Sequence, residues 1–319
     1  EMRPARCIWI MALVACLLFM AVPAQAVDQP ELGARVVKIL EIDGLKFKDL
    51  NKNGKLDAYE DWRLPVDERV KNLVSLMTLE EKVGQMVHPW LQVSADGVLD
   101  LFAPETSRTA FDGALIKTLN ANTTINKLHI THVLNNGQAP PATFAAWSNR
   151  VQEVAEATRL GIPVKFSSDP RHSVAGRSGV QYFSKWPDQI GLAATRDVKL
   201  VEEFGKVVAA EYRAVGLHEA LHPQADLATE PRWRRIGGTF GEDAQLAAEM
   251  TYAYIHGLQG DTIGPNSVLA MAKQFGAEGL RTGASTRTTR ADSTRCTLAT
   301  SSIIILFRGR RLSGHTRLR

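Results

Sequence analysis

Apolar residues recur at helical spacing in four long segments of this chain, and short apolar runs lie between them. Val66, Val70 and Leu73 share one face of the first segment, which continues to residue 77. Thr78–Glu81 then has the sequence of a capping box, which predicts that a further helix begins there. The other predicted helices cover 144–158, 199–215 and 243–258, and the predicted strands cover 131–134, 162–167, 217–221 and 267–273. Strands and helices that alternate in this way predict parallel β-α units.

The first 26 residues have the pattern of a secretory signal peptide. Arg3 and Arg6 give a positive start, 8–22 is apolar, and Ala24–Ala26 is a small-x-small cleavage site. The apolar run is short for a membrane span. Leu13–Cys16 fits a lipoprotein box, but the apolar residues after it disfavour a lipoprotein. We therefore expect a periplasmic or secreted protein that has no membrane span after cleavage.

The composition is that of a globular protein, with 45% hydrophobic and 23% charged residues among 319. The formal charge of +4 comes from residues 276–319, which hold nine arginines, no lysine and two acidic residues. This tail carries +7, so the rest of the chain carries −3. No nucleic-acid-binding motif accompanies the tail, and we expect no nucleic-acid partner. Cys296 is the one cysteine left after signal cleavage, so no intramolecular disulfide is expected.

Twelve residues that begin at Asp49 have the spacing of an EF-hand calcium loop, with a glycine at position six for the turn. The candidate ligands are Asp49, Asn51, Asn53, Asp57 and Glu60, together with the main-chain carbonyl of Lys55. The helix that usually precedes such a loop is not expected, because 36–48 predicts a pair of strands. The alternative is an Asx-rich turn that is stable without metal. We expect a structural calcium ion here and no cofactor for catalysis.

The segment His222–Asp243, HPQADLATEPRWRRIGGTFGED, combines carboxylates, arginines and a tryptophan around a Gly-Gly turn. Carboxylates and guanidinium groups hold sugar hydroxyls by charge-assisted hydrogen bonds, and an indole face covers the apolar side of a pyranose. A surface loop with salt bridges has a similar composition, so the order of residues decides. The segment resembles the PQADLATEPRWGRI-GTFGED block of glycoside hydrolase family 3, the β-glucosidase family. Further resembling blocks are FKDLNKNGKLDAYEDWRLPVDERVKNLVSLMTLEEKVGQM from Phe47, GIPVKFSSDPRH from Gly161, WPDQIGLAATRD from Trp186 and MAKQF from Met271.

The resemblance implies an α/β fold: an incomplete (β/α)8 TIM barrel, the N-terminal domain of the family, preceded by a short calcium-loop extension. We expect a signal peptide at 1–26, the extension at 27–62, the partial barrel at 63–275 and a disordered basic tail at 276–319. Chemistry in such barrels lies at the C-terminal ends of the strands. Asp169, Arg232–Arg235 and Lys273 all follow predicted strands.

The resemblance also implies a sugar-binding site. Asp169 matches the family's aspartate that grips hydroxyls of the terminal sugar, although an aspartate at a strand end can also be a simple cap. Arg235 matches the substrate-binding arginine of PRWGR, and Lys273 matches the lysine of the family's Lys-His pair. Gln274 stands where histidine is usual, and its amide can bond a hydroxyl without carrying charge. His172 is a candidate to orient Asp169, with a purely structural histidine as the alternative.

Retaining glycosidases need two carboxyls about 5 Å apart, one a nucleophile and one an acid/base. The family's nucleophilic aspartate lies in an SDW-like motif beyond the Lys-His pair, and its acid/base glutamate lies further on; we find neither in this sequence. We predict an exo-acting, retaining β-glucosidase-like chain that binds a β-glucoside or oligosaccharide but is inactive as written. The alternatives are a β-xylosidase or β-N-acetylhexosaminidase of the same family, and an inactive fragment that binds sugar or calcium. The KHFPGHG motif of the hexosaminidase branch is absent.

The resemblance stops after Phe275, where the family continues with PGGGPQ, DG and later FDYHLIP. Degenerate codons for 277–283 and 301–308, read at one shifted offset, permit GGPQDG and FDYHLIP in the same order. We hypothesise a single-base insertion or deletion near codon 276. A natural basic tail is the alternative.

Overall fold

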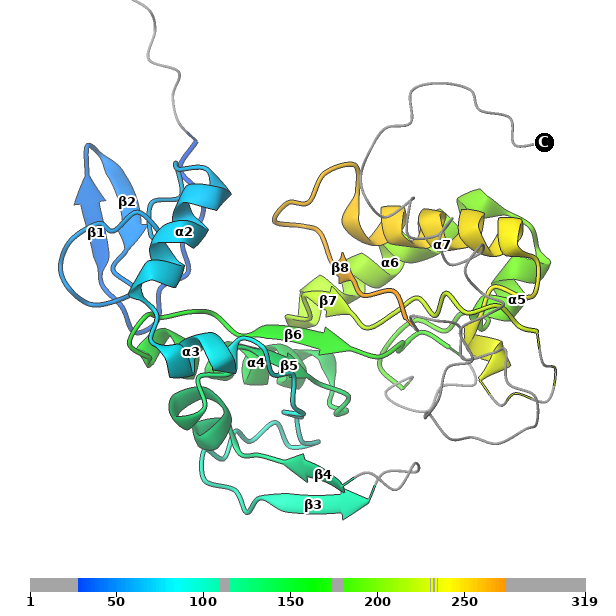
Figure 1. Cartoon of the computed structure of the whole chain (residues 1–319), viewed down its shortest axis with the longest axis horizontal. Coiled ribbons are helices and arrows are strands. Elements are labelled where there is room, and N and C mark those ends of the chain that lie inside the picture. The colour runs from blue at the N-terminus through cyan, green and yellow to red at the C-terminus, as the bar shows by residue number, and fades with distance from the viewer. Residues whose placement is uncertain are drawn as a thin grey trace, which may run out of the picture.

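The computed structural model of the chain describes residues 28–109, 115–173, 181–229, 231, 233 and 235–273 (Figure 1). The predicted signal peptide, the basic tail and Gln274 lie outside these residues. Among the helices that are described, none is long and apolar enough to cross a lipid bilayer.

A parallel sheet of four strands forms the centre of the fold. The strands, which neighbour one another in chain order, are β5 (His132–Leu134), β6 (Lys165–Ser168), β7 (Glu219–Ala220) and β8 (Leu269–Ala270). Each overlaps a predicted strand and is shorter than it. Trp90 adds a parallel bridge to Leu134 at the β5 edge. Chain-order parallel strands are the arrangement of a barrel wall, and over the part of the chain that is described the wall stays open.

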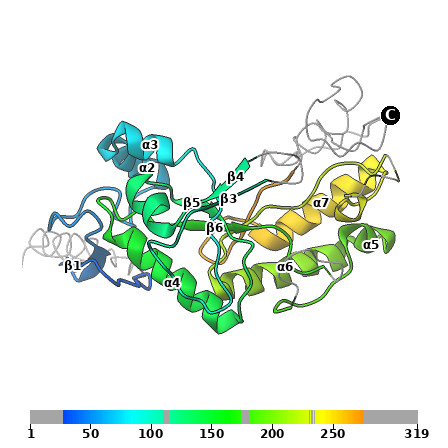
Figure 2. The ribbon, with the colours of Figure 1, turned by 90° about the horizontal axis from the view of Figure 1, so that it is seen from below.

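Three long helices pack against this sheet and confirm three predicted ones. They are α4 (Pro141–Ala157), α6 (Val198–Val215) and α7 (Ala244–Gln259). The side chains of Asp197 and Asp243 cap the N-termini of α6 and α7 by accepting bonds from main-chain N–H groups. Figure 2 shows α4 and α6 running along the same side of β5 and β6. Short right-handed connections between parallel strands place helices on the same face in this way.

The hydrophobic core lies between the sheet and these helices. Val133 and Phe166 are fully buried on the helical side, and the ring of Phe166 lies 5.5 Å from that of Trp147 on α4. The residues on either side of Phe166, Lys165 and Ser167, alternate to the opposite face, as the pleat of a strand requires. Other core residues that are fully buried are Val151, Ala155, Val201, Val208, Tyr212, Leu217, Ala220, Met250 and Val268.

Two further helices, α2 (Val66–Leu76) and α3 (Leu79–Gly84), lie on the side of the molecule away from α6 and α7 (Figure 1). The capping box is confirmed, because Thr78 Oγ1 accepts from Glu81 N at 3.2 Å and Glu81 Oε2 accepts from Thr78 N at 2.9 Å. The apolar face predicted for α2 is not buried, however: no residue of α2 is buried, and Val70 is 51% exposed. The exposed apolar surface of this segment comprises Val66, Val70, Val74, Leu76, Leu79, Val83, Met86 and Val87.

The predicted strand pair at the N-terminus is an antiparallel hairpin of β1 (Ile39–Ile42) and β2 (Leu45–Lys48). Its two-residue turn has Asp43 and Gly44 at positive φ, which matches the twist of such hairpins. Several short elements were not predicted. They are the hairpin of β3 (Thr106–Thr109) and β4 (Leu115–Thr118), the π-helix η1 (Asn122–Lys127), α5 (Gln189–Ala194) and the 3-10 helix η2 (Ile236–Gly238). Each is too short for hydrophobic periodicity to reveal it.

Candidate functional site

Asp169 and Lys273 meet at the C-terminal ends of two strands of the sheet. Asp169 follows β6 directly, and Lys273 lies just beyond β8. Lys273 Nζ lies 2.5 Å from Asp169 Oδ1, although the two residues are 104 positions apart in the chain. The side chains of Lys273 and Asp169 are 21% and 36% exposed, so solvent or a ligand can reach them. The structure thus brings together two of the predicted sugar-binding residues, at the end of the sheet where barrel enzymes place their chemistry.

Lys273 is positioned by main-chain pairing that continues the β7–β8 ladder beyond the two short strands. Its N–H donates to Pro223 O at 2.9 Å, and it forms a parallel bridge with Gln224. Its own carbonyl accepts a bond from Ala225 N. The ammonium therefore projects from a paired segment rather than from a free loop.

Asp169 is held at its side chain and at its main chain. Asn136, in the loop after β5, donates from Nδ2 to Asp169 Oδ2 at 2.8 Å and accepts from Asp169 N at 3.1 Å. The hydroxyl of Tyr212 on α6 donates to Asp169 O at 2.9 Å. Both carboxylate oxygens thus have one protein donor each, and each keeps acceptor capacity for a further hydroxyl.

Two opposing effects act on the Asp169 carboxyl. Burial raises its pKa, but the charge of Lys273 and the hydrogen bonds from Lys273 and Asn136 outweigh burial and hold the pKa below its ordinary value. The group is therefore a carboxylate at neutral pH. A carboxylate beside an ammonium offers strong acceptors and donors side by side, which suits neighbouring hydroxyls of a sugar.

A buried chain of hydrogen bonds lies beneath Asp169. His222 Nε2 is 3.1 Å from the Tyr212 hydroxyl, and His222 Nδ1 is 2.8 Å from the Tyr254 hydroxyl. Burial lowers the pKa of His222 well below its usual range and raises that of Tyr254 well above. Burial also raises the pKa of Tyr212, so all three groups are neutral. Since the Tyr212 proton is directed at Asp169 O, His222 Nε2 donates to Tyr212 and Nδ1 accepts from Tyr254.

His172 does not contact Asp169 in the way we expected. Its Nε2 lies 3.0 Å from Glu211 Oε2, which also accepts from Ser184 N. The ring is buried among Phe183, Phe204 and Tyr212, and this burial lowers its pKa. The direct role in orienting Asp169 is therefore corrected to the structural alternative: His172 ties the segment after β6 to α6.

The other two predicted sugar-binding residues are Arg235 and Gln274. Arg235 is partly buried at the N-terminus of η2, well beyond the end of β7 at Ala220, so it does not follow a strand directly as we predicted. Its role in binding sugar stays a prediction. Gln274 lies outside the described residues.

The loop Asp49–Glu60 is closed by its own hydrogen bonds. The buried carboxylate of Asp49 accepts from Asn53 N and Gly54 N, both at 3.0 Å. Glu60 Oε1 accepts from Leu50 N at 2.7 Å. The amides of Asn51 and Asn53 both donate to Asp57 Oδ2 at 2.7 Å.

Nowhere in the described ranges do three or more His, Cys, Asp or Glu side chains gather as metal ligands. The carboxylates of Asp49, Asp57 and Glu60 have hydrogen-bond donors within the loop, as the Asx-rich alternative requires. The donor set itself, with carboxylate and amide oxygens, suits calcium.

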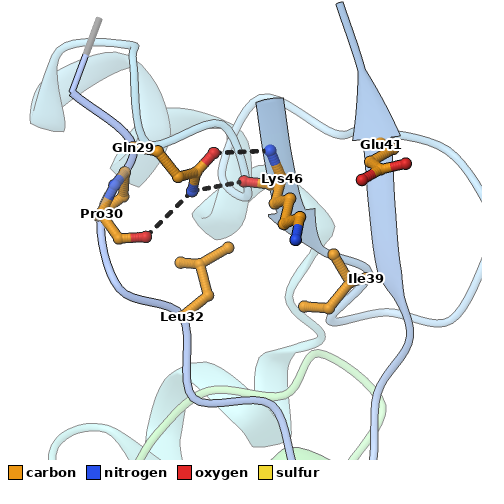
Figure 3. A pocket seen from close by; sticks show the side chains of 6 residues that line it. All are labelled: Gln29, Pro30, Leu32, Ile39, Glu41 and Lys46. Atoms are coloured by element: carbon orange, nitrogen blue, oxygen red, sulfur yellow. Dashed lines mark hydrogen bonds between the residues drawn. The ribbon is translucent and has the colours of Figure 1, made fainter. Parts of the chain in front are cut away.

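A hollow of about 510 Å³ lies elsewhere, at the N-terminal hairpin (Figure 3). It is lined by Gln29, Pro30, Leu32, Ile39, Glu41 and Lys46. The Gln29 side chain pairs with both main-chain groups of Lys46, accepting from N at 2.7 Å and donating to O at 3.3 Å. The amide thus covers the outer edge of β2. None of the predicted sugar-binding residues lines this hollow.

Four residues of the site were not among our predictions: Asn136, Arg171, Tyr212 and His222. Asn136 follows a predicted strand, as Asp169 does, so the same positional argument could have found it. Arg171 lies within the SDPRH block and His222 begins the HPQAD block. Tyr212 had no signal beyond its place in an amphipathic helix.

The residues of this site lie within a segment that matches a known protein family. A family model described as "Glycosyl hydrolase family 3 N terminal domain" matches residues 78–302. The chain belongs to glycoside hydrolase family 3. The match includes Asp169, Arg235 and Lys273, and it extends past Phe275 into the segment that we predict to be out of frame. That hypothesis stays a prediction.

Curated relatives in the family are considerably longer than this chain. A periplasmic beta-glucosidase/beta-xylosidase of Dickeya chrysanthemi is 45% identical over 269 residues, which cover 82% of this chain and 39% of the relative. A probable beta-glucosidase C of Aspergillus oryzae is 44% identical over 229 residues, covering 70% and 34%. The chain thus spans between a third and two-fifths of the length of these relatives.

Solved structures confirm the fold. The exo-1,3/1,4-beta-glucanase of a Pseudoalteromonas species superposes with a TM-score of 0.52 at 23% identity, covering 72% of this chain and 26% of that protein. At this identity the likeness shows the fold alone. The α/β fold of the family's N-terminal domain is therefore confirmed, with the barrel open over the described residues.

Proposed function

We propose that this chain forms the sugar-binding face of an exo-acting, β-glucosidase-like glycoside hydrolase. The observation that carries the proposal is the Asp169–Lys273 pair at the C-terminal ends of β6 and β8. An ionised carboxylate and an ammonium in contact, both partly exposed, can bind neighbouring hydroxyls of a terminal β-D-glucosyl residue. The family membership of the chain and the names of its relatives support this substrate class.

The proposed role is binding rather than bond cleavage. A retaining mechanism needs a nucleophile and an acid/base about 5 Å apart. Asp169 is engaged by Lys273 and Asn136, and we assign neither catalytic carboxyl to a residue of this sequence. Groups that position a sugar without these two carboxyls do not hydrolyse it. We therefore expect no hydrolysis of an aryl β-glucoside by the chain as written, and turnover at a normal enzymatic rate would overturn this expectation.

The test of the proposal is a titration of the full chain with methyl β-D-glucoside, followed by NMR. We expect saturable binding, and at least about tenfold weaker binding for Asp169→Asn, because a hydrogen bond to a charged group contributes about 1.5–3 kcal/mol. Asp261→Asn is the control, since that side chain is 95% exposed. Absence of binding by the wild-type chain, or equal binding by Asp169→Asn, would reject the site.

A β-xyloside is the alternative substrate, because the Dickeya relative is named for both activities. A xylosyl unit lacks the hydroxymethyl group of glucose. The same titration with methyl β-D-xyloside separates the two: tighter binding of the xyloside would favour the β-xylosidase alternative.

We also propose a structural calcium ion in the loop Asp49–Glu60. The spacing of the oxygen ligands along the loop supports the proposal. The amides of Asn51 and Asn53, which donate to Asp57, are what the alternative of a metal-free, Asx-rich turn requires. Isothermal titration decides between them. Absence of calcium binding in the millimolar range would remove the ion.

The chain is further proposed to be periplasmic or secreted, as the name of the Dickeya relative suggests. The mass of the protein recovered from a secreting host tests this proposal. We expect a species that has lost residues 1–26. Recovery of uncleaved protein from the cytoplasm would contradict it.

A further inference from the structure

We propose that Asn136 and Arg171 are positioning residues that hold Asp169 in its sugar-binding orientation, with Arg171 fixing the loop and Asn136 fixing the carboxylate. This inference rests on the proposed sugar site. It adds two residues to that site, neither of which we expect to touch the sugar.

Asn136 forms hydrogen bonds with both the main chain and the side chain of Asp169. Its Oδ1 accepts from Asp169 N at 3.1 Å and its Nδ2 donates to Asp169 Oδ2 at 2.8 Å. The two ends of the amide cannot be exchanged, because an N–H faces one and a carboxylate faces the other. Together with Lys273 on Oδ1, this bond fixes the plane of the carboxylate. A sugar then meets an ordered acceptor and loses no affinity in ordering it.

Arg171 holds the main chain on both sides of Asn136. Its Nη2 donates to Asn135 O at 2.6 Å and its Nη1 donates to Gly137 O at 2.9 Å. Its Nε donates to Ser168 Oγ at 2.6 Å, and Ser168 immediately precedes Asp169. One guanidinium therefore ties the loop after β5 to the end of β6.

The surroundings of Arg171 explain why an arginine suits this place. The side chain is only 1% exposed, and its guanidinium carbon lies 5.3 Å from the ring centres of both Phe144 and Phe183. A planar guanidinium stacks face to face on aromatic rings and directs several donors in fixed directions, whereas a lysine ammonium is a compact charge with no plane to stack and no fixed set of donor directions. The hydrogen bonds of Arg171 described above all go to neutral oxygens, two in the loop after β5 and one at the end of β6. Because this buried cation binds loop carbonyls rather than an anion, we infer that it fixes the position of the loop.

The test compares three forms of the full chain: wild type, Asn136→Leu and Asn136→Asp. Two quantities are measured in each, the titration of the Asp169 carboxyl by carbon-13 NMR without sugar, and the affinity for methyl β-D-glucoside. We expect the pKa of Asp169 to rise in Asn136→Leu and to rise further in Asn136→Asp, where two carboxylates face each other. We expect sugar binding to weaken up to about tenfold in Asn136→Leu, because the Asp169 carboxylate must then be ordered when the sugar binds. Gln138→Met, an exposed position of the same loop, is the control and should change neither quantity.

The outcomes separate the inference from the proposed function. If the wild-type chain binds no sugar, the proposed function fails, while the Asp169 titrations still decide whether Asn136 acts on Asp169. If sugar binds but Asn136→Leu leaves both the pKa of Asp169 and the affinity unchanged, the inference is overturned. Arg171→Lys keeps the positive charge but loses the set of fixed guanidinium donors. It should therefore raise the pKa of Asp169 and weaken sugar binding, as Asn136→Leu does. A folded Arg171→Lys with wild-type values would remove Arg171 from the inference.

Discussion

The helices α2 and α6 have similar sequence patterns and very different surroundings. Both place apolar residues on one face, yet α6 buries seven residues, from Val201 to Val215, whereas α2 buries none. The face of α6 packs against α7 and, through Tyr212, reaches the site. The face of α2 remains open to solvent, together with apolar residues of α3.

The difference teaches that hydrophobic periodicity predicts a face but not what covers it. The contribution of an apolar face to stability comes from the area that is removed from water. Substitutions on α6 and α7 should therefore be costly, and substitutions on the exposed face of α2 should be nearly neutral.

A substitution where α6 and α7 cross should cause the largest loss of stability. A Cβ on Gly257 would lie 2.2 Å from Glu202 O and 2.8 Å from the Cα of Gly205, both main-chain atoms that cannot move aside. We expect Gly257→Ala to lower the free energy of unfolding by about 3 kcal/mol or more, despite the higher helix propensity of alanine. Urea unfolding measures the change. Gly264→Ala, where nothing lies within 4 Å, is the matched control.

The next effect is a dependence of stability on pH at the sheet. Burial lowers the pKa of His218, beside Phe166, to about 4. The unfolded chain takes up a proton near pH 6.5 and the folded chain only near pH 4, so stability is lost as the pH falls through this window. The loss should reach about 3 kcal/mol. His218→Gln should flatten this slope of unfolding free energy against pH, and an unchanged slope would contradict the assignment.

A smaller effect is expected at the start of α3. Thr78 and Glu81 satisfy two otherwise unpaired N–H groups there. Thr78→Ala should lower the free energy of unfolding by about 1 kcal/mol, and Thr78→Ser should restore it, because serine offers the same acceptor. Equal stability of the alanine and serine variants would contradict this contribution of the cap.

The smallest effect should come from the exposed face of α2. Val70→Lys should change the free energy of unfolding by less than about 0.5 kcal/mol. It should also raise solubility, because it interrupts an exposed apolar surface. Val208→Lys is the opposing case, since Val208 is fully buried on α6 and should not tolerate a charge. A large loss of stability for Val70→Lys would break the comparison between the two helices.

Much of the fold could be predicted because its signals are local. The strands at β5 to β8, the helices α4, α6 and α7, and the capping box at Thr78 all follow from periodicity and short-range hydrogen bonding. The pairing of Asp169 with Lys273 was also accessible, since both follow strands that share one edge of a parallel sheet. The orientation of His172 toward Glu211 was not, because a buried histidine can turn to any of several neighbours.

The sequence by itself determined the family, the alternation of strands and helices, and the identity of the carboxylate and the ammonium at the proposed sugar site. These depend on residue order and on interactions between near neighbours along the chain. The tertiary structure decided what holds that site together: Asn136 on the carboxylate, Arg171 on the loop carbonyls, and Tyr212 on the main chain of Asp169. It also decided that no residue of α2 is buried, although the pattern predicts an apolar face there. Such contacts join segments far apart in the chain, and their geometry exists only once the sheet and its helices have packed.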